Sequence, residues 1–164
     1  MIRLFVAFDL PADLRLRLTG LRGQVPGAGW VPAENMHLTL RFVGEVTESV
    51  AEDVHDALAR VAGDPFEIQL FGVGQFDSRG QVHALWAGLA PESRHFHPHV
   101  TLARCRDTRL ARVAPFVAVH AGFQAAPFQV DSFVLYSSAL GRSGPSYISE
   151  VVYPLGAFVT TDQD

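Results

Sequence analysis

The chain contains no lysine and a single cysteine, and these two shortages exclude several kinds of protein. Cys105 alone can form neither a disulfide within the chain nor a zinc site built from cysteines. All thirteen basic residues are therefore arginine, whose planar guanidinium suits phosphate, although a genome-wide composition bias would give the same count. The formal net charge of −4 argues against a protein that grips long nucleic acid by neutralising many phosphates. A site that binds one terminal phosphate remains compatible with this charge.

Long apolar runs are also missing from the sequence. No stretch approaches the roughly 18 apolar residues that a membrane span requires, and the apolar start is too short for a signal-peptide core. We therefore expect a soluble, cytoplasmic protein that acts without a membrane and as a monomer. With 164 residues, 48% of them hydrophobic, the chain can bury the core of a single domain that covers residues 1–164.

Two short stretches repeat one pattern of histidine, apolar residue, threonine and leucine. They are His37-Leu38-Thr39-Leu40 and His99-Val100-Thr101-Leu102, hereafter the first and second tetrads. Two such copies arise by chance in roughly one chain in ten thousand of this composition, subject to the false-positive risk of short motifs. In a strand, residues i and i+2 leave the same face, so each tetrad presents a His and a Thr on one side and apolar residues on the other.

The remaining sequence predicts an α+β fold with antiparallel sheets, because strand and helix patterns alternate with short connections and turn signals. The tetrads lie in two of the predicted strands. The predicted elements are a strand over 2–8, a helix capped by Asp9 and ending near Gly23, a strand through 37–43 with a turn at Gly44, a helix from Thr47 to Gly63, a hairpin of 66–70 with 82–86, a strand over 96–104, a helix over 108–120, and strands over 128–136 and 147–153.

A pair of histidines suits phosphodiester chemistry without a metal. The free imidazole titrates near pH 6.5, so one ring can accept a proton while the other donates one. Thr39 and Thr101 could donate hydrogen bonds to phosphate oxygens on the same face. Arg41 shares the face of His37 by strict alternation, whereas Arg104 falls on the face opposite His99 unless a bulge re-aims it.

Several stretches of the sequence resemble the 2H phosphoesterases, and within them the RNA 2′,3′-cyclic phosphodiesterases of the 2′-5′ RNA ligase family. The resemblance extends over nearly the whole chain, in the family's order. The matching stretches are residues 3–11, 30–32, 37–45, 85–88 and 98–104, together with Gly144-Pro145 and Tyr147.

The resemblance implies a bilobal fold, with two antiparallel sheets flanking a central cleft, helices outside, and one tetrad on each lobe. It implies hydrolysis of an RNA 2′,3′-cyclic phosphate end, or of a small cyclic nucleotide, to a 2′-phosphate without metal or other cofactor. Ligation of 2′-5′ bonds by reversal would be secondary. By the same resemblance His37 is the acid, His99 the base, and Thr39, Thr101 and Arg104 contact phosphate.

Two departures from the family pattern bear on these expectations. Between Leu89 and Phe96 the chain has only six residues, where relatives are expected to carry a helix of about twenty, so one lobe would lack a helix. His97 stands where relatives often have Arg, and its spacing places it on the His99 face.

Two alternatives remain open from the sequence. Alternate spacing could place His95, His97 and His99 on one strand face as ligands of a metal-dependent hydrolase. The short segment after Leu89 would also suit a non-catalytic module that binds nucleotides or RNA ends.

Overall fold

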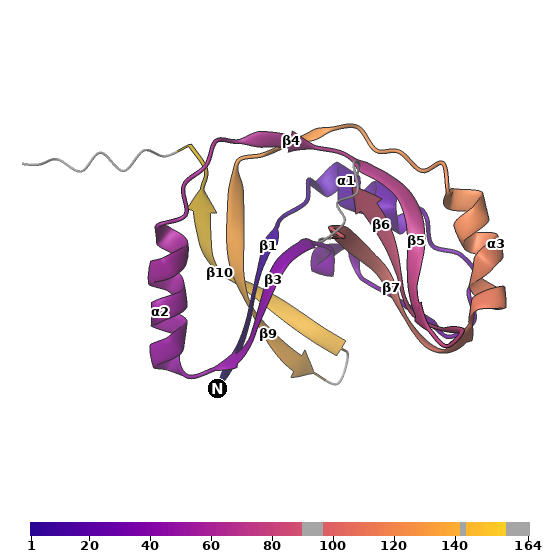
Figure 1. Ribbon diagram of the computed structural model, residues 1–164, viewed down its shortest axis with the longest axis horizontal. Helices are drawn as coiled ribbons and strands as arrows, with labels where there is room; N and C mark the ends of the chain where they lie inside the picture. Colours follow the sequence, from indigo (N-terminus) through magenta and orange to yellow (C-terminus); the bar gives the residue numbers. More distant parts are fainter. Residues whose placement is uncertain (90–96, 142–143, 157–164) are drawn as a thin grey trace, which may run out of the picture. The chain divides into compact units, whose positions relative to one another are not determined.

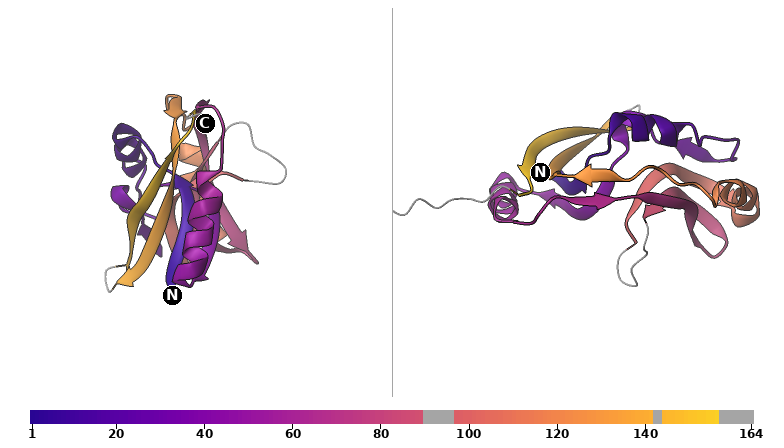
Figure 2. Two further views of the ribbon diagram at one scale, coloured as in Figure 1. Left: turned by 90° about the vertical axis from the view of Figure 1, so that its left-hand side faces the viewer. Right: turned by 90° about the horizontal axis from the view of Figure 1, so that it is seen from above.

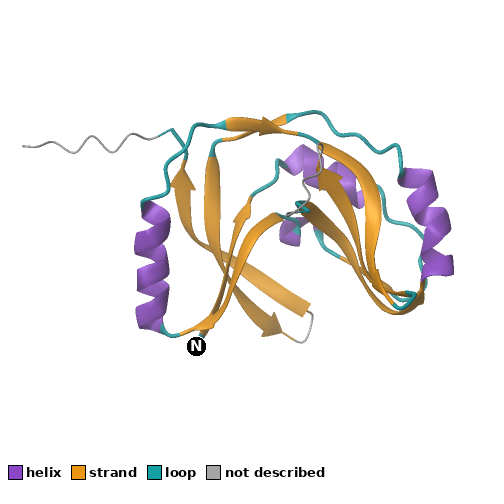
Figure 3. Ribbon diagram, viewed as in Figure 1, coloured by secondary structure: helices purple, strands orange, loops and turns teal. Residues whose placement is uncertain are grey.

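The structure is a computed structural model that describes residues 1–89, 97–141 and 144–156. The chain contains both helices and strands, and the helices separate runs of strands (Figures 1 and 3). The pairings of β9 with β1 and β10, of β6 with β5 and β7, and of β7 with β2 and β3 are all antiparallel. The α+β class expected from the sequence is therefore confirmed. The chain divides into two compact units, which are residues Met1–Phe8, Leu40–Glu67 and Gln129–Asp164, and residues Asp9–Thr39 and Ile68–Phe128.

The first unit contains a sheet in the order β10-β9-β1-β3 and one helix, α2. Strands β9 and β10 run side by side in every view (Figures 1 and 2). The hydroxyl of Thr47 caps α2 by accepting a hydrogen bond from the Val50 backbone N–H, as the sequence predicts. Val54 and Leu58 of α2 pack against a buried cluster that includes Val6 and Phe133. The elements are β1 Ile2–Phe8, β3 Leu38–Val46, α2 Glu48–Ala59, β9 Ser132–Gly141 and β10 Gly144–Pro154.

An open apolar cavity of about 630 Å³ lies within this unit, between α2 and the sheet. No residue of α2 is fully buried, which is consistent with loose packing of the helix. Arg41 and Asp64 are the charged residues among the cavity's lining. The cavity thus belongs to the first unit, whereas both His-Thr pairs belong to the second.

The second unit contains strands in the order β7-β6-β5, and β7 also pairs with β2 and with Leu38 at the start of β3. Helix α3 packs on β5, β6 and β7, while α1 buries Leu14 and Leu18 and contacts the short helix η1. Strands β4 and β8 form a separate two-stranded pair, and the boundaries between the units fall within both of these strands. The elements are α1 Ala12–Thr19, β2 Ala28–Trp30, η1 Ala33–Asn35, β4 Phe66–Ile68, β5 Leu70–Ser78, β6 Gln81–Leu89, β7 His99–Arg109, α3 Leu110–His120 and β8 Phe128–Val130.

Some sequence-based boundaries are wrong. The first helix is preceded by Pro11 and not capped by Asp9, because the carboxylate of Asp9 binds Arg15 and the Leu10 backbone N–H. The helix ends at Thr19, earlier than expected. The hairpin partner of β6 is Leu70–Ser78 and not 66–70. Its turn is a two-residue one at Arg79 and Gly80, which both have positive φ.

Two further regions complete the comparison with the sequence. Ala28 and Gly29 form strand β2 together with Trp30, and no strand was predicted there. Strand β3 continues past the expected turn at Gly44 to Val46. The shortened segment Ala90–His95 lies outside the described residues. No helix in the described part of the chain is long and apolar enough to cross a membrane.

Candidate active site

The two tetrads meet in one antiparallel strand pair. Leu38 of β3 lies directly opposite Val100 of β7, and both belong to the second unit. The resemblance had led us to expect one tetrad on each lobe, but all the His and Thr residues of the two tetrads fall in this single unit. Extending the antiparallel register by one residue sets His37 beside Thr101 and Thr39 beside His99. Four polar side chains therefore share one patch of sheet.

Burial separates the two faces of this strand pair as the alternating pattern predicts. Leu38, Val100 and Leu102 are buried to within 1% of full burial. The His and Thr residues on the alternate positions remain partly exposed. Among the described residues, the hydroxyls of Thr39 and Thr101 make no hydrogen bond to another protein group. They are available as donors to a bound anion.

Each active-site imidazole is oriented by the same local contact. His37 Nδ1 lies 2.8 Å from the carbonyl oxygen of Asn35, and His99 Nδ1 lies 2.7 Å from that of His97. In both cases the acceptor belongs to the residue two positions earlier. A carbonyl can only accept, so Nδ1 carries the proton and the neutral ring has its lone pair on Nε2. In both rings Nε2 is then the nitrogen that can accept a proton.

His37 is held by the short helix η1 and sits among positive charges. Burial lowers the pKa of His37 from 6.5 to about 4; the Asn35 carbonyl opposes this change, and the charges of Arg104, Arg15 and His99 add to it. The ring is therefore neutral at pH 7 in the free protein. A neutral imidazole with its lone pair on Nε2 is suited to accept a proton.

His99 packs against two aromatic side chains, Phe76 of β5 and Trp86 of β6, hereafter the aromatic wall. Its ring meets Phe76 edge to face, with centroids 4.8 Å apart, and lies 6.5 Å from Trp86. The indole has room because Gly74 lies opposite it, where a Cβ would come within 2.4 Å of Trp86 Cζ2. A small hollow beside His99 is lined by these aromatic rings and by His97, whose side chain is exposed. The wall limits the orientations open to the His99 ring.

A β-bulge brings Arg104 to the histidine face. The register of β6 with β7 pairs Leu85 with Ala103 and Trp86 with Thr101, which leaves Leu102 without a partner on β6. Leu102 and Ala103 are consecutive and both buried, so the alternation shifts by one residue and Arg104 is exposed. The sequence analysis expected Arg104 to reach the histidine face only if such a bulge were present. Its charge acts on His37, and among the described residues its side chain has no hydrogen bond or ion pair.

Arg41 behaves differently from Arg104. It belongs to the first unit, is exposed, and lines the apolar cavity there. The structure does not bring it to the histidine face within the second unit. Its expected role at the phosphate stays a prediction from the sequence.

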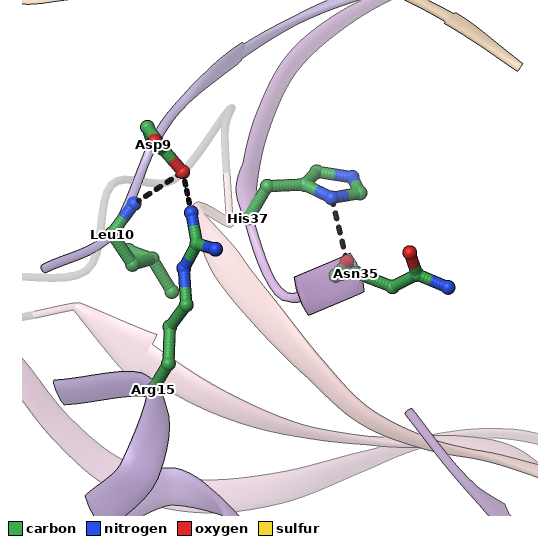
Figure 4. A network of polar contacts seen from close by, with 5 residues as sticks. All are labelled: Asp9, Leu10, Arg15, Asn35 and His37. Carbon is green, nitrogen blue, oxygen red and sulfur yellow. Dashed lines mark hydrogen bonds and ion pairs between the residues drawn. The ribbon is translucent and has the colours of Figure 1, made fainter. Parts of the chain in front are cut away.

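Sequence reasoning missed one pair of residues beside His37. Arg15 of α1 forms an ion pair with Asp9, whose Oδ1 also accepts the Leu10 backbone N–H at 3.0 Å (Figure 4). From the sequence we expect Asp9 to cap the helix, and Arg15 has no predicted role. The available signal was an arginine in the first turn next to buried Leu14, which is too common to single out.

The alternative of a metal site made of His95, His97 and His99 includes one residue that the structure does not describe. His95 is not among the described residues, and His97 and His99 alone do not make a metal site. Within residues 1–89, 97–141 and 144–156, no group of three or more His, Cys, Asp or Glu side chains could hold a metal ion.

Comparison with known proteins bears on the same residues. The family model of the LigT-like phosphoesterases matches residues 8–86 and 79–147. The RNA 2′,3′-cyclic phosphodiesterase of Aeropyrum pernix is 32% identical over 159 residues, covering 80% of this chain and 90% of its own length. The Escherichia coli protein of the same name is 30% identical over 168 residues, covering 88% of this chain and 92% of its own. That alignment is longer than this whole chain of 164 residues, so the relative has residues that the chain lacks.

Solved structures show the same similarity. E. coli LigT complexed with 3′-AMP has a TM-score of 0.74 and 26% identity, covering 94% of this chain and 98% of its own. The same protein complexed with phosphate has a TM-score of 0.72 and 27% identity, covering 94% and 97%. The resemblance read from the sequence is thereby confirmed.

Proposed function

Because the chain belongs to the LigT-like phosphoesterase family, we propose that it hydrolyses RNA 2′,3′-cyclic phosphate ends to 2′-phosphomonoesters, with His37 and His99 as the proton-transfer groups. The observation that carries the proposal is the pairing of Leu38 with Val100, which gathers both histidines and both threonines on one face. The names of the curated relatives support the substrate class. No step requires a metal or other cofactor, and ligation of 2′-5′ bonds would be the reverse of the same step.

The proposed reaction adds water to phosphorus and breaks the bond to the 3′ oxygen. One imidazole removes a proton from the attacking water through Nε2. The other donates a proton to the departing 3′ oxygen, which leaves as a hydroxyl. In-line attack places these two oxygens on opposite sides of phosphorus, so the two rings must act from different positions around it. Histidines on adjacent strands, each oriented through Nδ1, fit this requirement.

For the roles of the two histidines, we propose the reverse of the order that the resemblance implies. His37 is neutral in the free protein because its pKa is lowered to about 4, so it suits the base. His99 is then the acid that protonates the 3′ oxygen.

The remaining site residues would bind the phosphate. The hydroxyls of Thr39 and Thr101 flank the pair of histidines and can donate to the non-bridging oxygens. Arg104, which has no protein partner among the described residues, supplies a positive charge for the substrate monoanion. His97 would contribute through its carbonyl, which orients His99, and through the hollow that its residue lines.

The proposal is tested by substituting each histidine separately. His37→Ala and His99→Ala should each remove hydrolysis of 2′,3′-cyclic AMP and of a short RNA with a cyclic phosphate end. His83→Ala, which changes an exposed histidine of β6 bonded to Ser78, is the matched control and should keep full activity. Tight binding of nucleotides without turnover by the unmodified protein would instead support a binding module.

A further inference from the structure

Arg15 is a second cation beside His37 that no part of the proposed mechanism uses. It lies in the first turn of α1, and its side chain is only 22% exposed. Its charge reaches His37, as does that of Arg104. Helix α1 contacts η1, the element that supplies the carbonyl partner of His37. Arg15 is therefore tied to the same local framework as the imidazole.

The guanidinium of Arg15 is held in place, but not all of its N–H donors have an acceptor. Nη2 donates to Asp9, and the Asp9 carboxylate is itself fixed by the Leu10 backbone N–H (Figure 4). Nε is buried and has no hydrogen-bond partner among the described residues. Burying an N–H without an acceptor is costly, so this group is expected to gain an acceptor, such as an oxygen of a bound ligand. A guanidinium fixed by a carboxylate also needs little reorganisation when an anion arrives.

The negative charge on the substrate increases during the reaction, whereas Arg104 supplies a single positive charge. A cyclic phosphodiester carries one negative charge. When water adds and its proton passes to the base, the phosphorus centre carries two, and the phosphomonoester product is also a dianion near neutral pH. Arg104 complements the first charge. The second charge appears only as the reaction proceeds, and a further positive group close to His37 would stabilise it.

We propose that Arg15 is a substrate-contacting cation, which donates from the N–H groups that Asp9 does not take to a non-bridging phosphate oxygen as the second negative charge develops. This inference rests on the proposed function, since it concerns the same phosphate. No proton is transferred by Arg15, and the bonds made and broken are those of the hydrolysis itself. Because the contact strengthens with charge, Arg15 should act mainly on kcat and on product affinity.

The test compares Arg15 with a neighbour on the same helix. Arg15→Gln should lower kcat on 2′,3′-cyclic AMP by roughly a hundredfold, with KM changed by less than about threefold. Arg15→Lys keeps the charge and should recover part of the loss. Arg17→Gln is the matched control, because Arg17 instead donates to the Gln124 carbonyl at 2.6 Å and lies over the Phe123 ring. It should leave both constants unchanged.

Two further measurements separate this role from a structural one. Removing a positive charge near His37 favours its protonated form, so the acid limb of kcat/KM should move to higher pH in Arg15→Gln but not in Arg17→Gln. The variant should also bind the product 2′-AMP at least tenfold more weakly than the control does. Unchanged kcat in a folded Arg15→Gln protein, or a rise in KM alone, would overturn the inference.

The outcome remains separable from that of the proposed function. If the unmodified protein turns over no cyclic nucleotide, the proposed function fails. Binding of 2′-AMP then decides the role of Arg15, and equal affinity in Arg15→Gln and Arg17→Gln would reject it.

Discussion

Leu38 and Val100 are direct partners in an antiparallel strand pair, and both are buried almost completely. Each is the apolar residue between a His and a Thr. The pairing therefore works as a local two-fold arrangement, in which each histidine faces the threonine of the other tetrad. The repeated contact from Nδ1 to a carbonyl two residues earlier extends this equivalence to the orientation of the rings. Their surroundings differ, however, and this difference leads to the predictions below.

The acid and the base can be distinguished with a substrate in which sulfur replaces the 3′ oxygen. A thiolate leaves without protonation, so loss of the acid matters much less for this substrate. His99→Ala should lose about 10²- to 10⁴-fold in kcat on the oxygen substrate and regain most of it on the sulfur substrate. His37→Ala should remain slow on both. Recovery of His37→Ala instead would restore the order that the family resemblance implies.

Arg104 should matter for binding the substrate monoanion. Arg104→Gln should raise KM for 2′,3′-cyclic AMP by roughly 10- to 100-fold, the range expected for a hydrogen bond to a charged group. Arg106→Gln, an exposed arginine on the same strand beyond buried Cys105, should leave KM unchanged. Steady-state kinetics of the two variants make the comparison. Equal KM values would remove Arg104 from the phosphate site.

The aromatic wall beside His99 depends on a glycine. A Cβ at position 74 would lie 2.4 Å from Trp86 Cζ2, so Gly74→Ala must displace the indole. We expect a loss of about 1–3 kcal/mol in the free energy of unfolding, as for other overpacked sites, and a lower kcat. Gly122→Ala is the control, because a Cβ there has nothing within 4 Å. Urea denaturation would contradict the expectation if both variants were equally stable.

The pKa of His37 predicts a pH dependence of stability. Its pKa is about 4 in the folded protein against 6.5 for an unperturbed histidine, so between these values the unfolded chain binds more protons. The free energy of unfolding should therefore fall as the pH drops from 6.5 toward 4. His37→Gln should reduce this slope. Denaturation curves at several pH values measure it, and identical slopes in the two proteins would show that His37 is not buried as described.

The features predicted from the sequence are those that depend on local periodicity. Alternation in the tetrads was enough to place His37 and Thr39 on one face and Leu38 on the other, since each strand decides this by itself. The position of Arg104 required the register between β6 and β7, because the bulge at Leu102 exists only in relation to the neighbouring strand. From the sequence we could say that a bulge would bring Arg104 to the histidine face, but not whether β7 contains one.

Errors arose where distant segments compete. The stretch 66–70 has strand character, but its hairpin partner was wrong, because Leu70–Ser78 pairs with β6 while β4 pairs with β8. Asp9 has the residue type of a helix cap, yet its carboxylate is taken by Arg15. A preference for capping depends on local sequence, whereas the ion pair depends on the path of the chain between β1 and α1. The grouping of the His and Thr residues of both tetrads in one unit likewise follows from tertiary contacts alone.

The most direct test of the proposed activity is the position of the phosphate in the product. The unmodified protein would be incubated with 2′,3′-cyclic AMP in the presence of a strong chelator, and the product followed by phosphorus NMR. Hydrolysis by the paired histidines predicts 2′-AMP, formed at the same rate with and without chelator. Formation of 3′-AMP, or loss of turnover when metal is removed, would contradict the account.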